Sequence, residues 1–237
     1  MRTLTHGTIN HGDEYLDPTR RRMPTTYYGP HSGVALAIKN IGEAPRNIGV
    51  IGLGTGTIAA HGRPGDTIRY YEINPLVIGI ARTEFYYLSD CEAKVDIMLG
   101  DARLSLEREP SQDFDVLALD AFSSDSIPIH LLTVEAFRLY FRHLKPTGIL
   151  AVHVSNKYLD LKPIVGLAAK ALGKETCVID TDDEDDINEF GATWVLVGGD
   201  RQFFQKPAIS DGGTKLAGRS DLRLWTDDYS NLFRILK

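Results

Sequence analysis

The sequence predicts a doubly wound α/β domain, in which a parallel sheet carries helices on both faces. From residue 48 onward, short apolar runs alternate with helical segments. The runs are nearly continuous in apolar residues, which is typical of strands buried on both faces of a parallel sheet. The alternation of such strands with helices is the pattern of the doubly wound class.

The length and composition agree with one globular domain. The 237 residues correspond to one full domain plus at most a small appendage. Hydrophobic residues make up 43% of the chain and charged residues 24%, which excludes collagen-like, low-complexity and disordered proteins. The 32 acidic residues outnumber the 26 basic residues, and this balance argues against a nucleic-acid-binding protein.

No membrane segment is expected in this sequence. No run approaches 18 consecutive apolar residues, and the N-terminus lacks the pattern of a signal peptide. Cys91 and Cys177 are isolated and do not have the spacing of a metal site or a CxxC motif. A reducing, cytoplasmic location is therefore expected.

The expected elements follow in order along the chain. Residues 1–32 are polar and turn-rich, and we expect a short hairpin followed by a loop as an N-terminal appendage. The α/β domain then covers residues 33–237 and begins with a helix over 33–40. Its expected strands cover 48–53, 67–72, 94–99, 114–119, 148–154, 175–180 and 192–198. Its expected helices lie near 56–62, 75–87, 101–108, 133–144 and 161–173. For residues 199–237 the pattern favours strand and loop equally.

A glycine-rich loop and an acid follow the first two strands at their carboxyl ends, where open α/β sheets bind ligands. The loop GLGTG contains Gly52, Gly54, Thr55 and Gly56. Its glycines allow a tight turn and a close approach to a ligand, and the next helix presents free N–H groups. The second strand ends in Glu72, whose carboxylate can accept both hydroxyls of a ribose.

Acids also end the third and fourth strands. Asp101 can accept the exocyclic amine of an adenine, while the N–H of the adjacent Ala102 donates to a ring nitrogen. Asp120 ends the fourth strand, and a polar loop with Asp125 follows it. Any one such acid is often only a cap of the next helix. Together with the glycine loop, however, the three acids predict an adenosine-type ligand.

A nicotinamide dinucleotide is the rival ligand, because it also uses a glycine turn and an acid on the second strand. The spacing here is GxGxG rather than GxGxxG. A dinucleotide fold also gives no reason for the GDA segment at 100–102 or the acidic loop after the fourth strand.

Several segments resemble the spermidine synthase-like proteins, which are polyamine aminopropyltransferases built on the class I S-adenosylmethionine-dependent methyltransferase fold. The resemblance is strongest over 114–156 and includes YYEIN at 70–74 and GDA at 100–102. The segments at 6–12, 24–33 and 226–232 are more similar to a bacterial branch that is often fused to membrane helices. The resemblance implies a Rossmann-like sheet, and a soluble domain cut from, or related to, a membrane-fused protein.

The resemblance implies a sulfonium nucleoside as co-substrate, either S-adenosylmethionine or its decarboxylated form, and no metal. Glu72 would hold the ribose, Asp101 the adenine, and the loop 52–56 the tail. Asp120 would stand where the family carries its catalytic acid. An amine with a pKa near ~10 is protonated at neutral pH. A carboxylate that orients the amine and accepts its proton typically contributes roughly 10²–10⁴-fold.

The acceptor implied by the resemblance is a small amine such as putrescine. Asp125 would bind the second ammonium of a diamine. The remaining candidate substrate-binding residues are Tyr27, Tyr28, His31 and Asp228. Family members carry an acid beside the tyrosine and histidine, and the segment at 27–32 has none. Family members are commonly dimers or tetramers, so a homodimer is the implied assembly.

Thr55 departs from the family, because spermidine synthases usually have an aspartate at this place. A neutral threonine favours a full methionine carboxylate, which an aspartate would repel. The alternatives are therefore a methyltransferase or a lyase that uses S-adenosylmethionine itself, or a domain that senses the nucleoside without turnover. The acid at Asp120 favours catalysis, because a pure binder does not need it.

Overall fold

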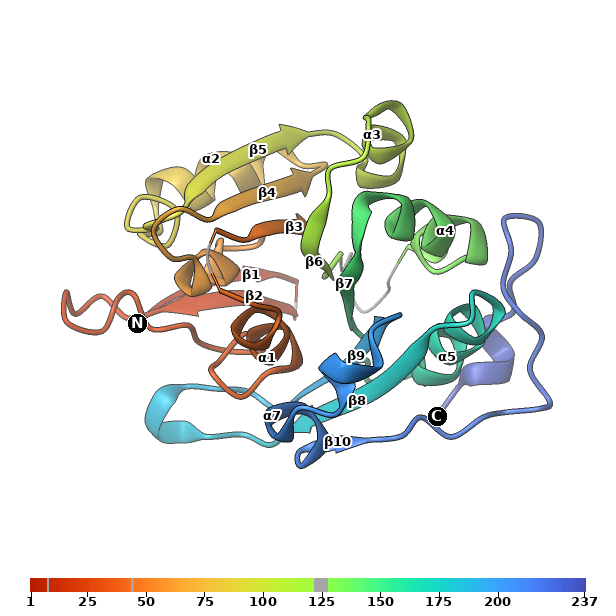
Figure 1. The fold of residues 1–237 in the computed structure, drawn as a ribbon. Helices are drawn as coiled ribbons and strands as arrows, with labels where there is room; N and C mark the ends of the chain where they lie inside the picture. The colour runs from red at the N-terminus through yellow and green to blue at the C-terminus, as the bar shows by residue number, and fades with distance from the viewer. Residues whose placement is uncertain (8, 44, 122–127) are drawn as a thin grey trace.

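The computed structural model describes residues 1–7, 9–43, 45–121 and 128–237. A large central sheet runs through this part of the chain (Figure 1). Within these residues the sheet has eight strands in the order β10-β8-β9-β7-β6-β3-β4-β5. Their bounds are β3 (Asn47–Ile51), β4 (Thr67–Glu72), β5 (Lys94–Leu99), β6 (Phe114–Leu119), β7 (Leu144–His153), β8 (Glu175–Thr181), β9 (Ala192–Gly198) and β10 (Gly213–Thr214). A separate hairpin consists of β1 (Arg2–His6) and β2 (Ile9–Glu14).

The five strands β3 to β7 pair in parallel, while β9 is antiparallel to both of its neighbours. The reversal follows from the connection between β8 and β9, which is too short for a crossover that would return the chain in parallel. The strand order reverses at β3: the next strand in the chain, β4, pairs with one edge of β3, and β6 pairs with the other. Ligands of open α/β sheets bind at the carboxyl ends of strands beside such a switch point.

Helices cover both faces of the sheet. The α-helices are α1 (Gly33–Asn40), α2 (Pro75–Thr83), α3 (Ala102–Arg108), α4 (Val134–His143), α5 (Lys162–Ala171), α6 (Arg201–Phe204) and α7 (Pro207–Ser210). Short 3₁₀ turns are η1 (Thr57–His61), η2 (Ile129–Leu131), η3 (Asp185–Ile187) and η4 (Leu232–Ile235). None of the helices in the described part of the chain has the length and hydrophobicity to cross a membrane.

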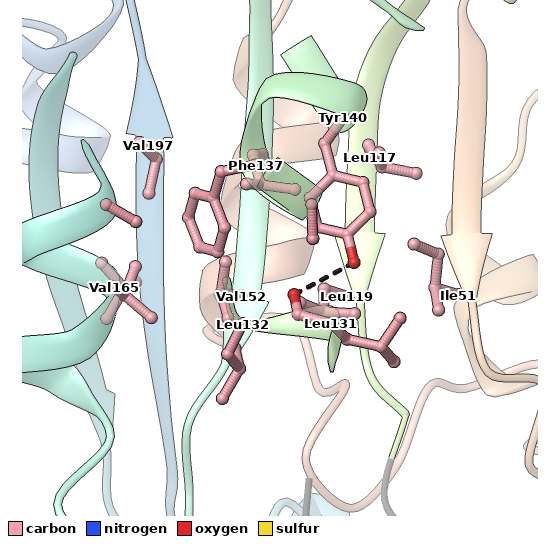
Figure 2. Close-up of a cluster of buried hydrophobic side chains, with 14 of the residues drawn as sticks. Ile51, Leu117, Leu119, Leu131, Leu132, Phe137, Tyr140, Val152, Val165 and Val197 are labelled. Carbon is pink, nitrogen blue, oxygen red and sulfur yellow. Dashed lines mark hydrogen bonds between the residues drawn. The ribbon is translucent and has the colours of Figure 1, made fainter. Parts of the chain in front are cut away.

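Two buried apolar clusters, one on each face, form the core. One cluster joins α3, α4 and α5 to the sheet, and the other joins α1, η1 and α7 to its opposite face. Figure 2 shows part of the first, in which Phe137 and Tyr140 of α4 pack over Leu117 of β6 and Val152 of β7. The Tyr140 hydroxyl donates to the Leu131 carbonyl over 3.0 Å, so this buried polar group is satisfied.

The predicted fold class is confirmed: the sheet is doubly wound, and a short hairpin precedes it. Four expected strands and the first helix have the predicted bounds. The segment after the glycine loop forms only the 3₁₀ turn η1, and β9 is not parallel to the rest. For residues 199–237 the pattern favoured strand or loop, and this segment instead contains the two short helices α6 and α7 besides the edge strand β10, the 3₁₀ turn η4 and irregular chain.

A buried ion pair connects the amino ends of β3 and β4. The guanidinium of Arg46 contacts the carboxylate of Asp66, and the two side chains are 1% and 0% exposed. Arg46 also donates to the carbonyls of Ile38 (2.7 Å) and His61 (3.3 Å), while the N–H of Arg63 donates to Asp66 (2.9 Å). This network satisfies both charges, which is the condition for burying them.

His61 lies beside this pair and is buried, and its Nε2–H donates to the carbonyl of Tyr28 over 2.7 Å. Burial is the main cause that lowers the pKa of His61 to about 4, and the charges of Lys39 and Arg46 add to it. The unfolded chain has the ordinary value of roughly 6.5. The folded protein therefore binds this proton more weakly, and its stability falls as pH drops from about 6.5 toward 4.

We expect the free energy of unfolding to contain a His61 contribution that falls by about 2–3 kcal/mol between pH 7.5 and 4.5. His61→Gln keeps an N–H donor for Tyr28 and cannot gain a charge, so its stability should depend less on pH by this amount. Urea unfolding of both proteins at the two pH values measures the difference. Equal pH dependence in the two proteins would show that His61 titrates normally in the folded state.

Candidate active site

The loop after β3 turns sharply around its glycines. Gly52 and Gly54 have φ angles of 98° and 54°, which disfavour other residues. A Cβ at Gly52 would collide with the Asp120 carbonyl, and one at Gly54 would lie 2.6 Å from the His11 carbonyl. The loop is therefore packed closely between β6 and the hairpin strand β2.

Thr55 is 1% exposed, and Gly12 of β2 lies directly against it. Its Oγ1 is 2.8 Å from the Thr57 hydroxyl, and its N–H donates to the His11 carbonyl over 3.4 Å. The hydroxyl is thus covered by the hairpin. The predicted contact between Thr55 and the donor tail stays a prediction, and it requires this region to open.

Glu72 ends β4 and connects it to the glycine loop. One carboxylate oxygen accepts from the N–H of Leu53 over 3.0 Å, and the other accepts from the N–H of Asn74 over 2.8 Å. The carboxylate is therefore fixed beside Gly52–Gly56, and its predicted contact with a ribose stays a prediction. Each oxygen retains a lone pair with which it can accept a hydroxyl of a ligand.

Asp101 caps α3, because its Oδ1 accepts from the Leu104 N–H over 2.9 Å. Its Oδ2 lies 3.2 Å from Nε2 of His130. Ala102 is the first residue of α3 and is buried. A cavity of about 590 Å³ opens beside Asp101, with Leu104 and Ile129 among its apolar lining and His130 among its polar lining. Asp101 therefore caps a helix, which is the alternative to a ligand role that the sequence left open. The adjacent cavity leaves space for a planar ring.

Asp120 lies at the end of β6 and has both carboxylate oxygens occupied. The Tyr28 hydroxyl donates to Oδ2 over 2.5 Å, and Nδ1 of His153 lies 2.7 Å from Oδ1. The side chains of Asp120 and His153 are 9% and 4% exposed. The His153 ring stacks on Trp194 with centroids 4.6 Å apart and an interplanar angle of 9°. The orientation of the carboxylate is therefore fixed from both sides.

The partners of the two ring nitrogens, Asp120 and Ser155, indicate which nitrogen of His153 carries a proton. The Ser155 Oγ accepts from the Thr193 N–H and lies 2.8 Å from His153 Nε2. An ionised carboxylate can only accept, so Nδ1 carries a proton toward Asp120. The hydroxyl of Ser155 is then oriented to donate to Nε2. The network therefore holds the Asp120 carboxylate in place at the carboxyl end of β6.

Tyr27 and Tyr28 lie on either side of this network. Burial, followed by the charge of Asp120, raises the pKa of Tyr28 well above its ordinary value. Tyr27 is half-buried and packs on His153 with centroids 5.4 Å apart. Burial and then the charges of Asp120, Asp13 and Asp183 raise the pKa of Tyr27. Both hydroxyls therefore stay neutral and able to donate.

The remaining predicted residues are His31, Asp228 and Asp125. His31 contacts an acid that is distant in the sequence, with its Nδ1 2.9 Å from Oε2 of Glu189. Asp228 is exposed, while its neighbour Asp227 pairs with Arg103 at the edge of the cavity. Asp125 falls outside the residues that the structure describes.

Sequence reasoning did not find the roles of Ser155, Trp194 and Glu189. The register of β7 and β9 places His153 opposite Trp194. That pairing is antiparallel, and no local pattern in either segment predicts it. An aromatic residue within the apolar run 192–198 is a signal for a core position only.

No protein-family model matches the chain. It is 32% identical over 145 residues to a polyamine aminopropyltransferase of Vibrio vulnificus, covering 59% of this chain and 46% of that protein. It is 26% identical over 157 residues to a probable polyamine aminopropyl transferase of Bifidobacterium longum, covering 65% of this chain and 33% of that protein. The chain therefore matches less than half the length of these relatives. The predicted resemblance to spermidine synthase-like proteins is confirmed.

Solved structures share the fold. A probable spermidine synthase from Corynebacterium glutamicum has a TM-score of 0.59 and 20% identity, over 84% of this chain and 78% of that one. Human methyltransferase-like protein 13 in complex with SAH has a TM-score of 0.52 and 21% identity, over 83% of this chain and 93% of that one. These likenesses support the class I methyltransferase fold, which hosts more than one chemistry.

Proposed function

We propose that the protein transfers an aminopropyl group from decarboxylated S-adenosylmethionine to an amine such as putrescine. The observation that carries this proposal is the Asp120 carboxylate, held by Tyr28 and His153 at the end of β6, where the main chain of Asp120 packs against the glycine loop. The fixed carboxylate supports a catalytic role, because a nucleoside-sensing domain does not need a proton acceptor at this place.

The reaction is an in-line displacement. The neutral amine nitrogen forms a bond to the carbon beside the sulfonium, the carbon–sulfur bond breaks, and methylthioadenosine leaves. The amine releases one proton, and Asp120 accepts it with a lone pair that Tyr28 and His153 do not use. Orientation of the amine and acceptance of its proton contribute roughly 10²–10⁴-fold in such reactions.

The charges around Asp120 favour a cationic acceptor. The charges of Asp13 and Asp183 reach Tyr27 together with that of Asp120. Asp13 is 5% exposed and accepts hydrogen bonds from the side-chain amides of Asn10 (2.9 Å) and Asn188 (3.0 Å). Carboxylates held in this way attract a substrate that carries ammonium groups.

Intact S-adenosylmethionine is the second candidate donor, and Thr55 is the observation that favours it. Spermidine synthases usually carry an aspartate there, whereas Thr55 brings no charge to repel a methionine carboxylate. With this donor the reaction is a methyl transfer, which leaves S-adenosylhomocysteine, or a cleavage that leaves methylthioadenosine.

Chromatography of nucleoside products tests the proposal. The protein is incubated with each donor, with and without putrescine. Methylthioadenosine that forms only from the decarboxylated donor with putrescine is the expected result. Products from S-adenosylmethionine would replace the proposal with the second candidate. Tight binding of both donors without any product would indicate a nucleoside-sensing domain.

Asp101→Ala should weaken binding of the donor by roughly 1–3 kcal/mol, because the variant leaves buried adenine donors without an acceptor. Since Asp101 also caps α3, Asp101→Ser is the matched variant, which keeps a capping oxygen but lacks the carboxylate. Isothermal titration calorimetry measures both. Wild-type affinity in the serine variant would refute the adenine assignment.

A further inference from the structure

Three side chains with metal-ligating atoms lie close together near the start of α1, and none of them belongs to the Asp120 network. They are His31, Glu184 and Glu189, and one ligand atom from each lies within 4.8 Å of the others. Nδ1 of His31 is 2.9 Å from an oxygen of Glu189 and 3.5 Å from an oxygen of Glu184. Two ligand atoms bound tetrahedrally to zinc lie roughly 3.3 Å apart, given bonds of about 2.0–2.1 Å. The two distances from His31 lie on either side of this value, and the ligand oxygens of Glu184 and Glu189 lie within 4.8 Å of each other.

The main chain places these residues independently of any attraction between their side chains. Glu184 and Glu189 pair as an antiparallel bridge, with N–H to carbonyl distances of 2.8 and 3.1 Å. The N–H of Phe190 donates to the Thr26 carbonyl over 3.1 Å, which connects this turn to the segment before His31. The His31 N–H donates to Glu189 Oε1 over 3.2 Å. The site is therefore largely formed without an ion.

Glu189 is a buried carboxylate without a permanent positive partner. Its side chain is 1% exposed, and Gly29 packs so closely on it that a Cβ there would collide with the carboxyl group. Across the described ranges, His31 is the only basic side chain within 4.0 Å of Glu184 or Glu189. The charge of Lys39 acts from farther away, and its Nζ donates to the Pro30 carbonyl. A buried carboxylate is costly unless a charge compensates it.

We propose that His31, Glu184 and Glu189 bind a divalent first-row metal ion, with zinc as the representative ion. One imidazole nitrogen and two carboxylate oxygens suit zinc and its neighbours, whereas calcium and magnesium prefer oxygen ligands alone. The side chains of His31 and Glu184 are 63% and 51% exposed, so water can occupy the remaining position. Protons compete with a metal ion for imidazole and carboxylate ligands, so the affinity for the ion decreases as pH falls.

Such an ion would connect two segments that are distant in the sequence. The turn 184–189 would be joined to the segment 26–31, which carries Tyr27 and Tyr28. Because Tyr28 donates to Asp120, the ion would stabilise one side of the candidate active site. It would not take part in the proposed transfer, so this inference does not depend on the proposed function.

Titration of the chelator-treated protein with zinc chloride tests the inference. Calorimetry should show one equivalent bound with a micromolar or lower dissociation constant. The melting temperature should rise by roughly 5 °C or more at a hundredfold excess over that constant. Cobalt(II) should give the visible absorption of a four- or five-coordinate ion. No binding up to millimolar zinc would overturn the inference.

Variants locate the site. Glu184→Gln changes an exposed side chain and should weaken zinc binding at least tenfold, and His31→Gln should do the same. Asp186→Asn is the matched control, because it removes one exposed acidic charge from the same turn without removing a ligand. Equal affinity in the Glu184→Gln and Asp186→Asn proteins would show general attraction to an acidic surface, and would also overturn the inference.

Discussion

Replacement of Asp120 by asparagine is expected to reduce turnover at least about a hundredfold while the donor still binds. The asparagine has nearly the same shape, and its amide cannot accept the proton of the amine. Its side-chain oxygen can still accept a hydrogen bond from Tyr28 or His153, so the surrounding network should persist. Single-turnover kinetics with the decarboxylated donor and putrescine measure the loss, and calorimetry with the donor alone measures binding.

Tyr28→Phe is the companion variant, because it removes one hydrogen bond to Asp120 and leaves the carboxylate. Its turnover should fall less than that of Asp120→Asn, since proton acceptance remains and only orientation is relaxed. If the Asp120→Asn protein keeps near-wild-type turnover, Asp120 is not the proton acceptor. A loss of donor binding in that variant would instead assign Asp120 to binding.

Arg46→Met is expected to lower the free energy of unfolding by about 3–5 kcal/mol, because it leaves the Asp66 carboxylate buried without its partner. The backbone carbonyls of Ile38 and His61 also lose a donor. Urea unfolding at pH 7.5 measures the change, and donor binding by the folded variant should be unchanged.

Arg201→Met provides the matched control for this effect. The ion pair between Arg201 and Glu175 has side chains that are 80% and 50% exposed, and exposed pairs contribute about 0–1 kcal/mol. A loss of about 1 kcal/mol or less in both variants would show that the buried Arg46–Asp66 network contributes no more than an exposed pair.

The fold was predictable because its signals are local. Buried parallel strands leave continuous apolar runs, so the bounds of β4 and β6 match the predicted ranges. The carboxyl ends of such strands meet at one edge of the sheet, and this geometry brings Glu72 and Asp120 to opposite sides of the glycine loop.

The rest of the site depends on contacts between distant segments. His153 meets Trp194 through an antiparallel strand pair, and His31 meets Glu189 across 158 residues of sequence. The position of Thr55 beneath β2 depends on how the hairpin docks. Contacts between distant segments leave no periodicity or spacing within either segment. The sequence could therefore predict which residues are candidates for the site, but not which residues they contact.

The amino and carboxyl ends of the parallel strands form two separate rims of the sheet, one with the buried ion pair and the other with the candidate site. Asp66 precedes β4 and Glu72 ends it, so one strand has an acid of the buried ion pair at its amino end and a candidate ligand acid at its carboxyl end. Changes in the free energy of unfolding caused by substitutions at such separated places are usually additive. A laboratory library can therefore diversify the two rims in independent rounds and combine the selected substitutions afterwards.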